Sequence, residues 1–389
     1  MEPHALRPTA ALLLLVACGD DAPPAAYSID TLPNGANHVV NHAPSGWSDT
    51  SGWRLILERT IVPPAEGPGS IGMIGSLAVD GAGAMYLFDP LDPVILAYGP
   101  EGEFRHRIGR SGDGPGEFRV GIHSVVGDTI AVQDGGNSRM VLFTTDGIAL
   151  GEWPGPFRAP DVLPVRTDGA IATQVWLRDR PETELDQFPG RAWAYYRLDG
   201  TPLDTVRTPP VPRTAMWRIA NERANFGMTV PFAPDREIVL TRSGTVVWGD
   251  QSASRLIFSR TGEDTVRITE FPGASVAIPD SVRRAAYEDA SRQHDWLTGI
   301  AKVEDIPTSF PRWMEMVVDG DMVWLRRALA DGTHRWQVID AEGRYLGELP
   351  APFEPNWRDQ WVEDRVYHVT TTAEGAPAVE VWQIDRSTP

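Results

Sequence analysis

Residues that could bind a metal ion are few in this chain and widely spaced. Two of the eight histidines, His38 and His42, are four residues apart, a spacing that would place both on one face of a helix. Gly35, Pro44 and Gly46 disfavour a helix in this stretch. We therefore predict that the two histidines belong to a linker.

The downstream histidines form no recognisable metal or catalytic motif. They are His106, His123, His294, His334 and His368. No H-x-x-x-H or H-E-x-x-H pair occurs among them, and the chain contains no G-x-S-x-G motif. The single cysteine, Cys18, lies close to the N-terminus. These patterns identify no catalytic residue, no metal ligand and no cofactor.

The stretch RIGRSGDGPGEF, residues 107–118, has the glycine content of a phosphate-binding loop. It holds four glycines but no lysine, whereas a P-loop reads G-x-x-x-x-G-K-[ST] and joins a strand to a helix. Here a strand follows, so no helix N-terminus is available for an anion. We predict that the glycines serve a chain connection, where they permit unusual backbone angles.

Cationic and aromatic side chains offer a different chemistry, the recognition of an anionic or carbohydrate ligand by hydrogen bonds and stacking. The candidates, chosen because they lie near the beginnings of inner strands or turns, are Arg119, His123, Arg139, Arg312 and Trp313. The alternative is that Arg139 holds loops together by donating to backbone carbonyls, and that the others are solvated.

A unit of short apolar strands separated by turns recurs six times and must position these side chains. The copies contain the stretches that start at Ala84, Thr129, Ala170, Thr245, Met322 and Arg365. Most copies follow a further apolar strand, so the unit has four strands, with a glycine in the last hairpin turn. The repeat predicts an all-β fold, a six-bladed β-propeller with four-stranded antiparallel blades. A β-sandwich or a β-solenoid is the alternative.

The ends of the repeat predict how the ring closes. The sixth copy stops after its third strand, at Asp385, while the strand at 52–61 has no hairpin partner. We expect the N-terminal strand to complete blade six, which would give a closed propeller over 52–386 without exposed sheet edges.

Two insertions interrupt the even spacing of the repeat, at 209–231 and at 271–312. The second contains SVRRAAYEDASRQHDWL, an alanine-rich helical stretch between blades four and five that Asp280 or Ser281 could cap. We expect this short helical insertion to cover the channel mouth, and the alternative is a role in packing alone.

The N-terminus contains an apolar run, residues 10–17, that follows Arg7 and is too short to span a bilayer. Leu15-Val16-Ala17-Cys18 resembles the lipobox of bacterial lipoproteins, which implies cleavage before Cys18 and diacylation of its sulfur. We predict a signal peptide at 1–17, a flexible tether at 18–51, and an exported lipoprotein anchored to a membrane through Cys18, facing the periplasm or the cell exterior. A buried strand with an incidental cysteine is the alternative.

Blade two carries the clearest family pattern. The matching positions are Gly112, Gly114, Pro115, Gly116, Glu117, Phe118, Asp134, Asn137, Arg139, Phe143 and Gly147. They resemble NHL-type repeats, of which blade one is a weaker copy. Over residues 52–386 the chain resembles six-bladed propeller lipoproteins of environmental bacteria. The resemblance implies a fold and little about function, because propellers host many unrelated functions.

Charge and composition narrow the function. The net charge of −18 argues against nucleic acid as a partner, because phosphates are bound by clustered Lys and Arg. We expect a binding module for a protein or a small ligand at one propeller face. The alternative is a metal-dependent lyase or hydrolase, lactonase-like or amidating-lyase-like, with Ca or Zn on the propeller axis.

Overall fold

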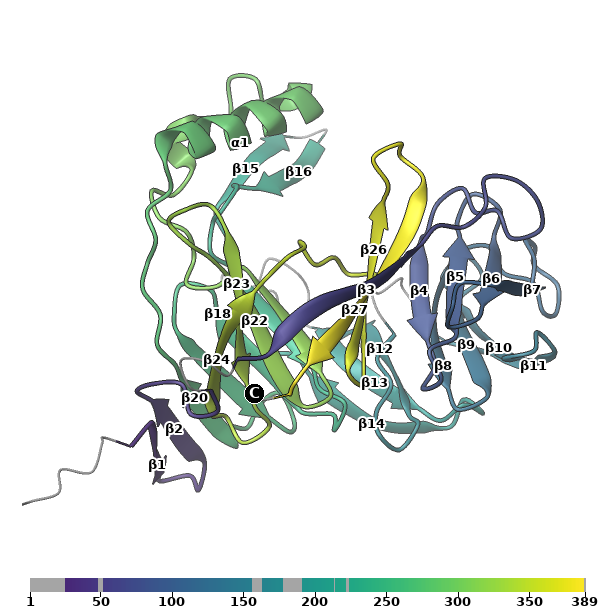
Figure 1. The fold of residues 1–389 in the computed structure, drawn as a ribbon, viewed down its shortest axis with the longest axis horizontal. Helices are drawn as coiled ribbons and strands as arrows, with labels where there is room; N and C mark the ends of the chain where they lie inside the picture. The colour runs from purple at the N-terminus through teal and green to yellow at the C-terminus, as the bar shows by residue number, and fades with distance from the viewer. Residues whose placement is uncertain are drawn as a thin grey trace, which may run out of the picture.

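Six β-sheet blades are arranged in a ring (Figure 1). The computed structural model describes residues 25–47, 52–155, 163–177, 191–212, 214–221 and 224–387. The predicted signal peptide at 1–17 and the predicted lipidation site Cys18 lie outside these residues. Within them, the expected all-β six-bladed propeller is confirmed.

Blades one and two each contain four antiparallel strands in sequence order. Blade one consists of β4 (Ser76–Val79), β5 (Met85–Asp89), β6 (Val94–Tyr98) and β7 (Phe104–Ile108). Blade two consists of β8 (Gly121–Val126), β9 (Thr129–Asp134), β10 (Arg139–Thr144) and β11 (Ala149–Pro154). The described part of blade three holds β12 (Ile171–Trp176), β13 (Arg191–Tyr196) and β14 (Pro202–Arg207), with a bridge from Val165 to Ile171.

Blades four to six follow the same plan. Blade four contains β17 (Arg236–Leu240), β18 (Val246–Asp250), β19 (Arg255–Ser259) and β20 (Arg267–Glu270). Blade five contains β21 (Glu315–Asp319), β22 (Met322–Ala328), β23 (His334–Ile339) and β24 (Tyr345–Pro350). Blade six contains β25 (Gln360–Val362), β26 (Arg365–Thr371), β27 (Pro377–Asp385) and the N-terminal β3 (Arg54–Ile61).

The apolar runs form strands because both faces of each blade are buried. In β5, Met85 and Leu87 pack in the core shared with blade six, whereas Tyr86 and Phe88 pack in the core shared with blade two. Alternate side chains of a strand point to opposite faces, so a continuous apolar run supplies two inter-blade cores at once.

The ring closes as predicted. Strand β3 pairs antiparallel with β27, from Ile61 opposite Val379 to Arg54 opposite Asp385. Figure 1 shows β3, in purple, beside the yellow C-terminal strands. The N-terminal strand therefore supplies the fourth strand that the sixth copy lacks.

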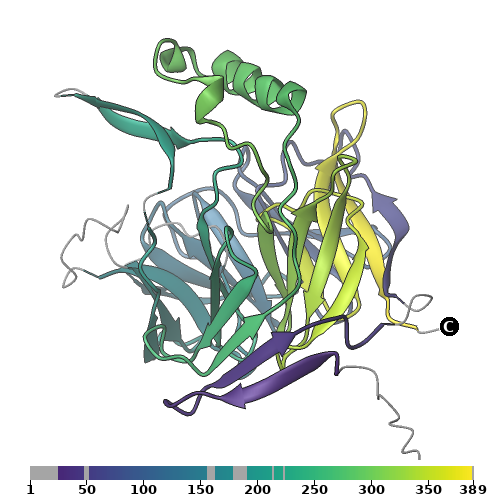
Figure 2. The same ribbon diagram turned by 90° about the vertical axis from the view of Figure 1, so that its left-hand side faces the viewer.

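The expectation of a flexible tether over 18–51 is wrong for its central part. Strands β1 (Tyr27–Thr31) and β2 (Asn37–Asn41) form a hairpin, and β2 pairs in parallel with β20, which extends blade four to six strands (Figure 2). Val39 is buried against the blade. The ring of Trp47 packs against that of Trp53, which in turn packs against Trp324. The Pro-, Asn- and Gly-rich composition masked these strands, because the blade against which β2 pairs, through β20, is distant in sequence.

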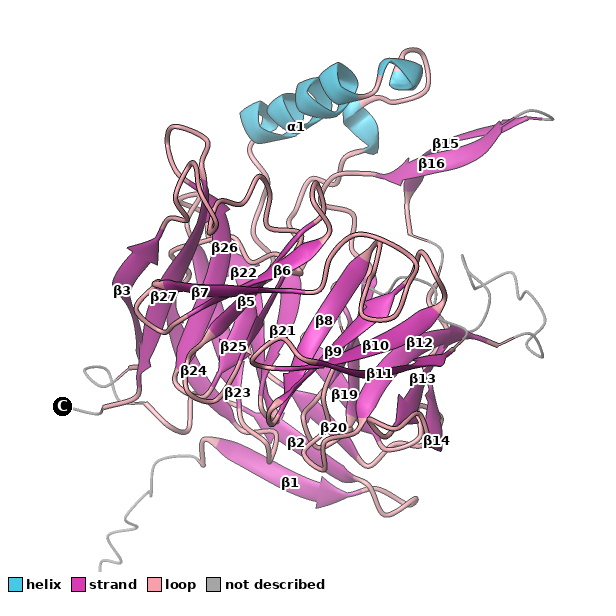
Figure 3. Cartoon of the chain, turned by 90° about the vertical axis from the view of Figure 1, so that its right-hand side faces the viewer, coloured by secondary structure: helices cyan, strands magenta, loops and turns pink. Residues whose placement is uncertain are grey.

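Both insertions leave the ring on the same side and pack against each other (Figure 3). The first forms the hairpin β15 (Met216–Asn221) and β16 (Ala224–Thr229). The second forms α1 (Asp280–Gln293), η1 (Asp295–Leu297) and η2 (Val303–Asp305). Trp217 is buried among residues of both insertions, and its Nε1–H donates to Asp305 at 2.9 Å. Coverage of the channel mouth stays a prediction.

The cap of the inserted helix differs from the expected one. Pro279 occupies the N-cap position, and no side chain caps the helix by a hydrogen bond. Asp280 lies in the first turn and pairs with Arg283 at 3.2 Å. Proline suits a helix start because its φ is already close to the required value.

Candidate functional site

The glycine-rich stretch is closed by its own side chains. Glu117 accepts hydrogen bonds from Arg110 Nε at 2.8 Å and from the Gly114 amide at 2.9 Å. Gly109 has φ +68°, and a Cβ there would lie 2.3 Å from the ring of Phe118, so only glycine fits. The carboxylate of Glu117 thus occupies the Gly114 amide, a donor that a bound anion would need. This agrees with a connecting role for the stretch.

Two predicted candidates, Arg119 and Arg139, brace this stretch. Arg139 donates to the carbonyl oxygens of Gly114 and Glu117 at 3.1 and 2.8 Å, and its Nη1 lies 2.9 Å from Glu152. Arg119 pairs with Asp113. Arg139 therefore holds loops together by donating to backbone carbonyls, which is the alternative role given above. Both guanidinium groups already have acceptors.

His123 is buried between the inner strands of blades one and two and does not line a channel mouth. Its Nε2 lies 2.8 Å from the Tyr86 carbonyl oxygen, and its Nδ1 lies 2.8 Å from the Ser76 hydroxyl. Because a carbonyl only accepts, the proton is on Nε2, and Ser76 donates to Nδ1. Burial lowers the pKa of His123 to about 4, so the ring is neutral at pH 7.

Trp313 is also buried, unlike its neighbour Arg312. Its ring has no exposed surface, and its Nε1–H donates to the Ala253 carbonyl at 3.0 Å. Arg312, one residue earlier, lines a groove. Arg119, His123 and Arg139 belong to blade two or its entry, whereas Arg312 and Trp313 precede blade five, so the five predicted candidates do not form one site.

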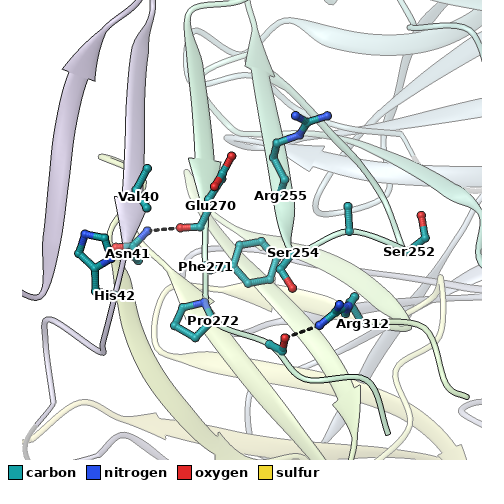
Figure 4. A pocket seen from close by; sticks show the side chains of 12 residues that line it. Val40, Asn41, His42, Ser252, Ser254, Arg255, Glu270, Phe271, Pro272 and Arg312 are labelled. Atoms are coloured by element: carbon teal, nitrogen blue, oxygen red, sulfur yellow. Dashed lines mark hydrogen bonds between the residues drawn. The ribbon is translucent and has the colours of Figure 1, made fainter. Parts of the chain in front are cut away.

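The groove that contains Arg312 lies along blade four (Figure 4). We call it the flank groove, and its volume is about 630 Å³. Its walls come from the end of β2, the turn between β18 and β19, and the chain leaving β20. The lining residues are Val40, Asn41, His42, Ser252, Ala253, Ser254, Arg255, Glu270, Phe271, Pro272, Gly273 and Arg312.

Hydrogen bonds from Asn41 fix one wall of the flank groove. Its side-chain amide donates to the carbonyl oxygens of Glu270 at 2.8 Å and Gly343 at 3.0 Å, and its Oδ1 accepts from the Tyr345 amide. Asn41 thus ties β2 to blades four and five. The hairpin that sequence analysis assigned to the tether is therefore a rigid wall of the groove.

Several hydrogen-bond donors that line the flank groove have no acceptor among the described residues. Arg255 is exposed and has no side-chain partner among the residues that the structure describes. One nitrogen of Arg312 donates to the Gly273 carbonyl, and its other donors remain available (Figure 4). The hydroxyl of Ser254 is buried without a hydrogen-bond partner. The single carboxylate of the lining, Glu270, lies 3.2 Å from His38. Such a set can recognise an anionic group.

Other polar groups between blades serve the fold. Burial raises the pKa of Glu237 to about 8, with Glu315 adding to the rise and the Met316 amide opposing it. Glu315 pairs with the buried Arg326 at 2.9 Å. These residues lie between the inner strands of blades four and five, and sequence analysis gave no signal for them because charged residues in a strand usually face solvent.

A buried acid–histidine pair lies in blade six. His368 Nδ1 is 3.0 Å from Asp359 Oδ2, and the imidazole stacks on Phe353 at 4.5 Å. Asp359 also accepts from the amides of Asn356 and Val369. These bonds join the loop before β25 to β26. Among the described residues, no group of three potential metal ligands is found.

Comparisons with known proteins identify no family. No family model matches the sequence, and no curated protein is significantly similar to it. Assignment to the NHL type therefore stays a prediction.

Several solved structures share low similarity with this chain. A proposed exported protein of Bacteroides fragilis has 12% identity and a TM-score of 0.48, with 90% of this chain and 99% of that chain covered. A DUF4221 family member of Bacteroides vulgatus has 11% identity and a TM-score of 0.45, covering 87% and 100%. Virginiamycin B lyase of Staphylococcus aureus has 11% identity and a TM-score of 0.40, covering 86% and 100%. At these values the likenesses carry no argument about function.

Proposed function

We propose that this protein is a binding module that takes a small anionic ligand, of which a carboxylate is the simplest example, in the flank groove. The observation that carries the proposal is that Arg255, Arg312 and Ser254, whose hydroxyl has no partner among the described residues, line one cavity. Charge-assisted hydrogen bonds from guanidinium groups to a carboxylate are among the strongest available to a protein surface.

Size and charge restrict the ligand. A volume of about 630 Å³ lies within the range of small-molecule pockets, roughly 300–1,000 Å³. The net charge of −18 repels polyanions, whereas a small anion experiences mainly the local guanidinium groups, because salt screens charges beyond about 8 Å. A compact mono- or dianion therefore fits better than an acidic polymer.

Isothermal titration calorimetry with acetate, succinate and glucuronate tests the proposal, with glucose as the uncharged comparison. We expect the anions to bind and glucose not to bind. Replacing both groove arginines, Arg255→Gln with Arg312→Gln, should weaken binding at least tenfold, since each lost charged hydrogen bond is worth about 1.5 kcal/mol or more.

The matched control is Arg260→Gln, which removes an exposed guanidinium at the other end of β19. Its affinity for the anions should equal that of the unaltered protein. Equal losses in the control and the groove variant, or binding of glucose as tight as that of glucuronate, would show that the groove is not an anion site.

We also propose that the protein is exported and anchored through Cys18. Support comes from the lipobox-like LVAC sequence. No helix in the described part of the chain is long and apolar enough to cross a membrane. Ala25, the first described residue, follows Cys18 by seven residues (25 − 18), so a lipid on Cys18 would hold the hairpin within roughly 25 Å of the bilayer.

Cell fractionation tests the anchor. The unaltered protein should sediment with membranes, and a Cys18→Ala variant should not, because two or more acyl chains are needed for stable attachment and the variant receives none on a sulfur. A Cys18→Ala protein that is exported and still membrane-bound would refute anchoring through this residue.

A further inference from the structure

A second cavity lies where the ring closes, between blade six and blade one. Its lining residues are Arg59, Asp80, Gly81, Ala82, Gly83, Pro100, Glu101, Val362, Glu363, Asp364, Arg365 and Tyr367. We call it the seam pocket. Strand β3 contributes Arg59, so the pocket exists only when the N-terminal strand has completed blade six. Its volume is about 210 Å³, space for roughly seven water molecules at about 30 Å³ each.

Two hydrogen-bond donors in the seam pocket have no acceptor among the described residues. The Nε of Arg59 is buried without a partner, and the nearest acid to this side chain is Glu58, 3.5 Å from Nη1. The hydroxyl of Tyr367 has no hydrogen-bond partner, and burial raises its pKa, so it stays protonated and can donate. Buried donors in proteins are nearly always paired, which makes the unpaired Arg59 Nε informative.

Nearby groups show that this lack of partners is specific. Arg365, in the same pocket, is satisfied by Glu58 at 2.9 and 3.1 Å and by Asp364 at 2.9 Å. A Cβ on Gly83, which has φ +81°, would lie 3.1 Å from the Tyr367 hydroxyl. Glycine at this position therefore leaves the hydroxyl uncovered.

The opposite rim of the seam pocket is acidic. Glu363 and Glu101 are exposed carboxylates that form no ion pair with any described residue. The backbone of Glu363 has φ +57°, a conformation that residues with a side chain rarely adopt, and its carboxylate lies over Gly81. Asp80 is already used, because it accepts from the amides of Ala82 and Ala84.

We propose that the seam pocket binds a small zwitterion, an α-amino acid or a close analogue. The carboxylate of the ligand accepts from the Arg59 guanidinium and the Tyr367 hydroxyl, and its ammonium group lies at the Glu363 and Glu101 rim. A simple anion is opposed by the acidic rim, and a simple cation is opposed by Arg59 and Arg365. The small volume restricts the ligand to short side chains.

Calorimetry with glycine and L-alanine tests this site, with acetate and methylammonium as the two halves of the ligand and L-tryptophan as an oversized comparison. Glycine or L-alanine should bind in the millimolar range or tighter. Acetate, methylammonium and L-tryptophan should bind at least tenfold more weakly.

Variants locate the binding. Tyr367→Phe keeps the buried ring and removes one hydrogen bond, which should weaken glycine binding about tenfold without a change in Tm. Arg59→Met should abolish it. Arg54→Met, an exposed change on the same strand, should leave it unaltered. Glycine binding that is absent in the unaltered protein, matched by acetate, or unchanged in Tyr367→Phe would overturn the proposal.

The two proposed sites can fail independently. Arg255→Gln with Arg312→Gln should leave glycine affinity unchanged, since these residues line only the flank groove. Conversely, Tyr367→Phe should leave glucuronate affinity unchanged.

Discussion

Blade two and blade four share one architecture but use their arginines differently. Around the glycine-rich stretch of blade two, Arg110, Arg119 and Arg139 all have acceptors within the protein. Along the flank of blade four, Arg255 has no partner among the described residues, and Arg312 has donors that none of them accepts. The strongest sequence pattern therefore marks a region that stabilises the fold, and the region with spare binding capacity carries no motif.

Blade four also differs from blade two in its strands: the N-terminal hairpin gives blade four six strands, whereas blade two has four. A chain that starts at residue 52 loses the hairpin and keeps β3, whereas a chain that starts at residue 62 loses both. We expect the first to fold cooperatively with a lowered Tm. The second should not fold, because losing the closing strand costs more than about 5 kcal/mol, comparable with the stability of a whole domain.

Circular dichroism melts of the two truncated chains measure this difference. The chain from residue 62 should show no cooperative transition. If both truncated chains melt alike, ring closure by β3 contributes little, and the hairpin and the closing strand have equivalent roles.

A buried acid at the inner strand of blade four predicts a pH effect. The pKa of Glu237, about 8, exceeds its ordinary value of 4.5 because of burial, so the folded state favours the protonated form. The resulting stabilisation is complete below pH 4.5 and is lost as pH rises through about 8. It amounts to at most about 5 kcal/mol, since a tenfold change in proton affinity is about 1.4 kcal/mol.

Glu237→Gln should remove this dependence. Its Tm, relative to the unaltered protein, should rise between pH 5 and pH 9, because glutamine carries no charge at either pH. Thermal melts over this range provide the measurement. A constant difference in Tm across the range would mean that Glu237 ionises normally in the folded protein.

Replacing one arginine in each of the two regions should give the next largest difference in the free energy of unfolding. Arg139→Ala removes the cation beside the buried Asp134 and the guanidinium donor to the Gly114 and Glu117 carbonyls, and it should cost about 3 kcal/mol. Arg255→Gln should change the free energy of unfolding by less than about 0.5 kcal/mol, as is usual for an exposed side chain. Tm measurements on both variants check the pair, and a larger loss for Arg255→Gln would contradict the contrast.

The fold could be predicted because its signals are local. Strand runs, glycine turns and the orphan strand at 52–61 each follow from period-two patterns and turn residues. The hairpin at 27–41 could not be predicted, because β2 pairs with β20, more than 200 positions away in the sequence. Its polar, turn-rich composition resembles a linker until that partner is known.

The candidate site was predicted only in part. Arg312 was selected because it precedes an inner strand, and it does line the flank groove. Trp313 and His123 were selected by the same rule, but Trp313 packs in the core between blades four and five and His123 lies between blades one and two, so both are buried. His42 was assigned to a linker and Arg255 carried no signal, since only the docked hairpin brings their segments together.

Among the described residues, the groove arginines have donors that are free for a ligand, whereas the blade-two arginines are paired within the protein. Side-chain Nε–H resonances in ¹H–¹⁵N NMR spectra report on each arginine directly during a titration with glucuronate. We predict that the signals of Arg255 and Arg312 shift with a common saturation curve while that of Arg139 stays in place. Shifts at Arg139 equal to those at Arg255, or no shift at either groove arginine, would contradict the claim.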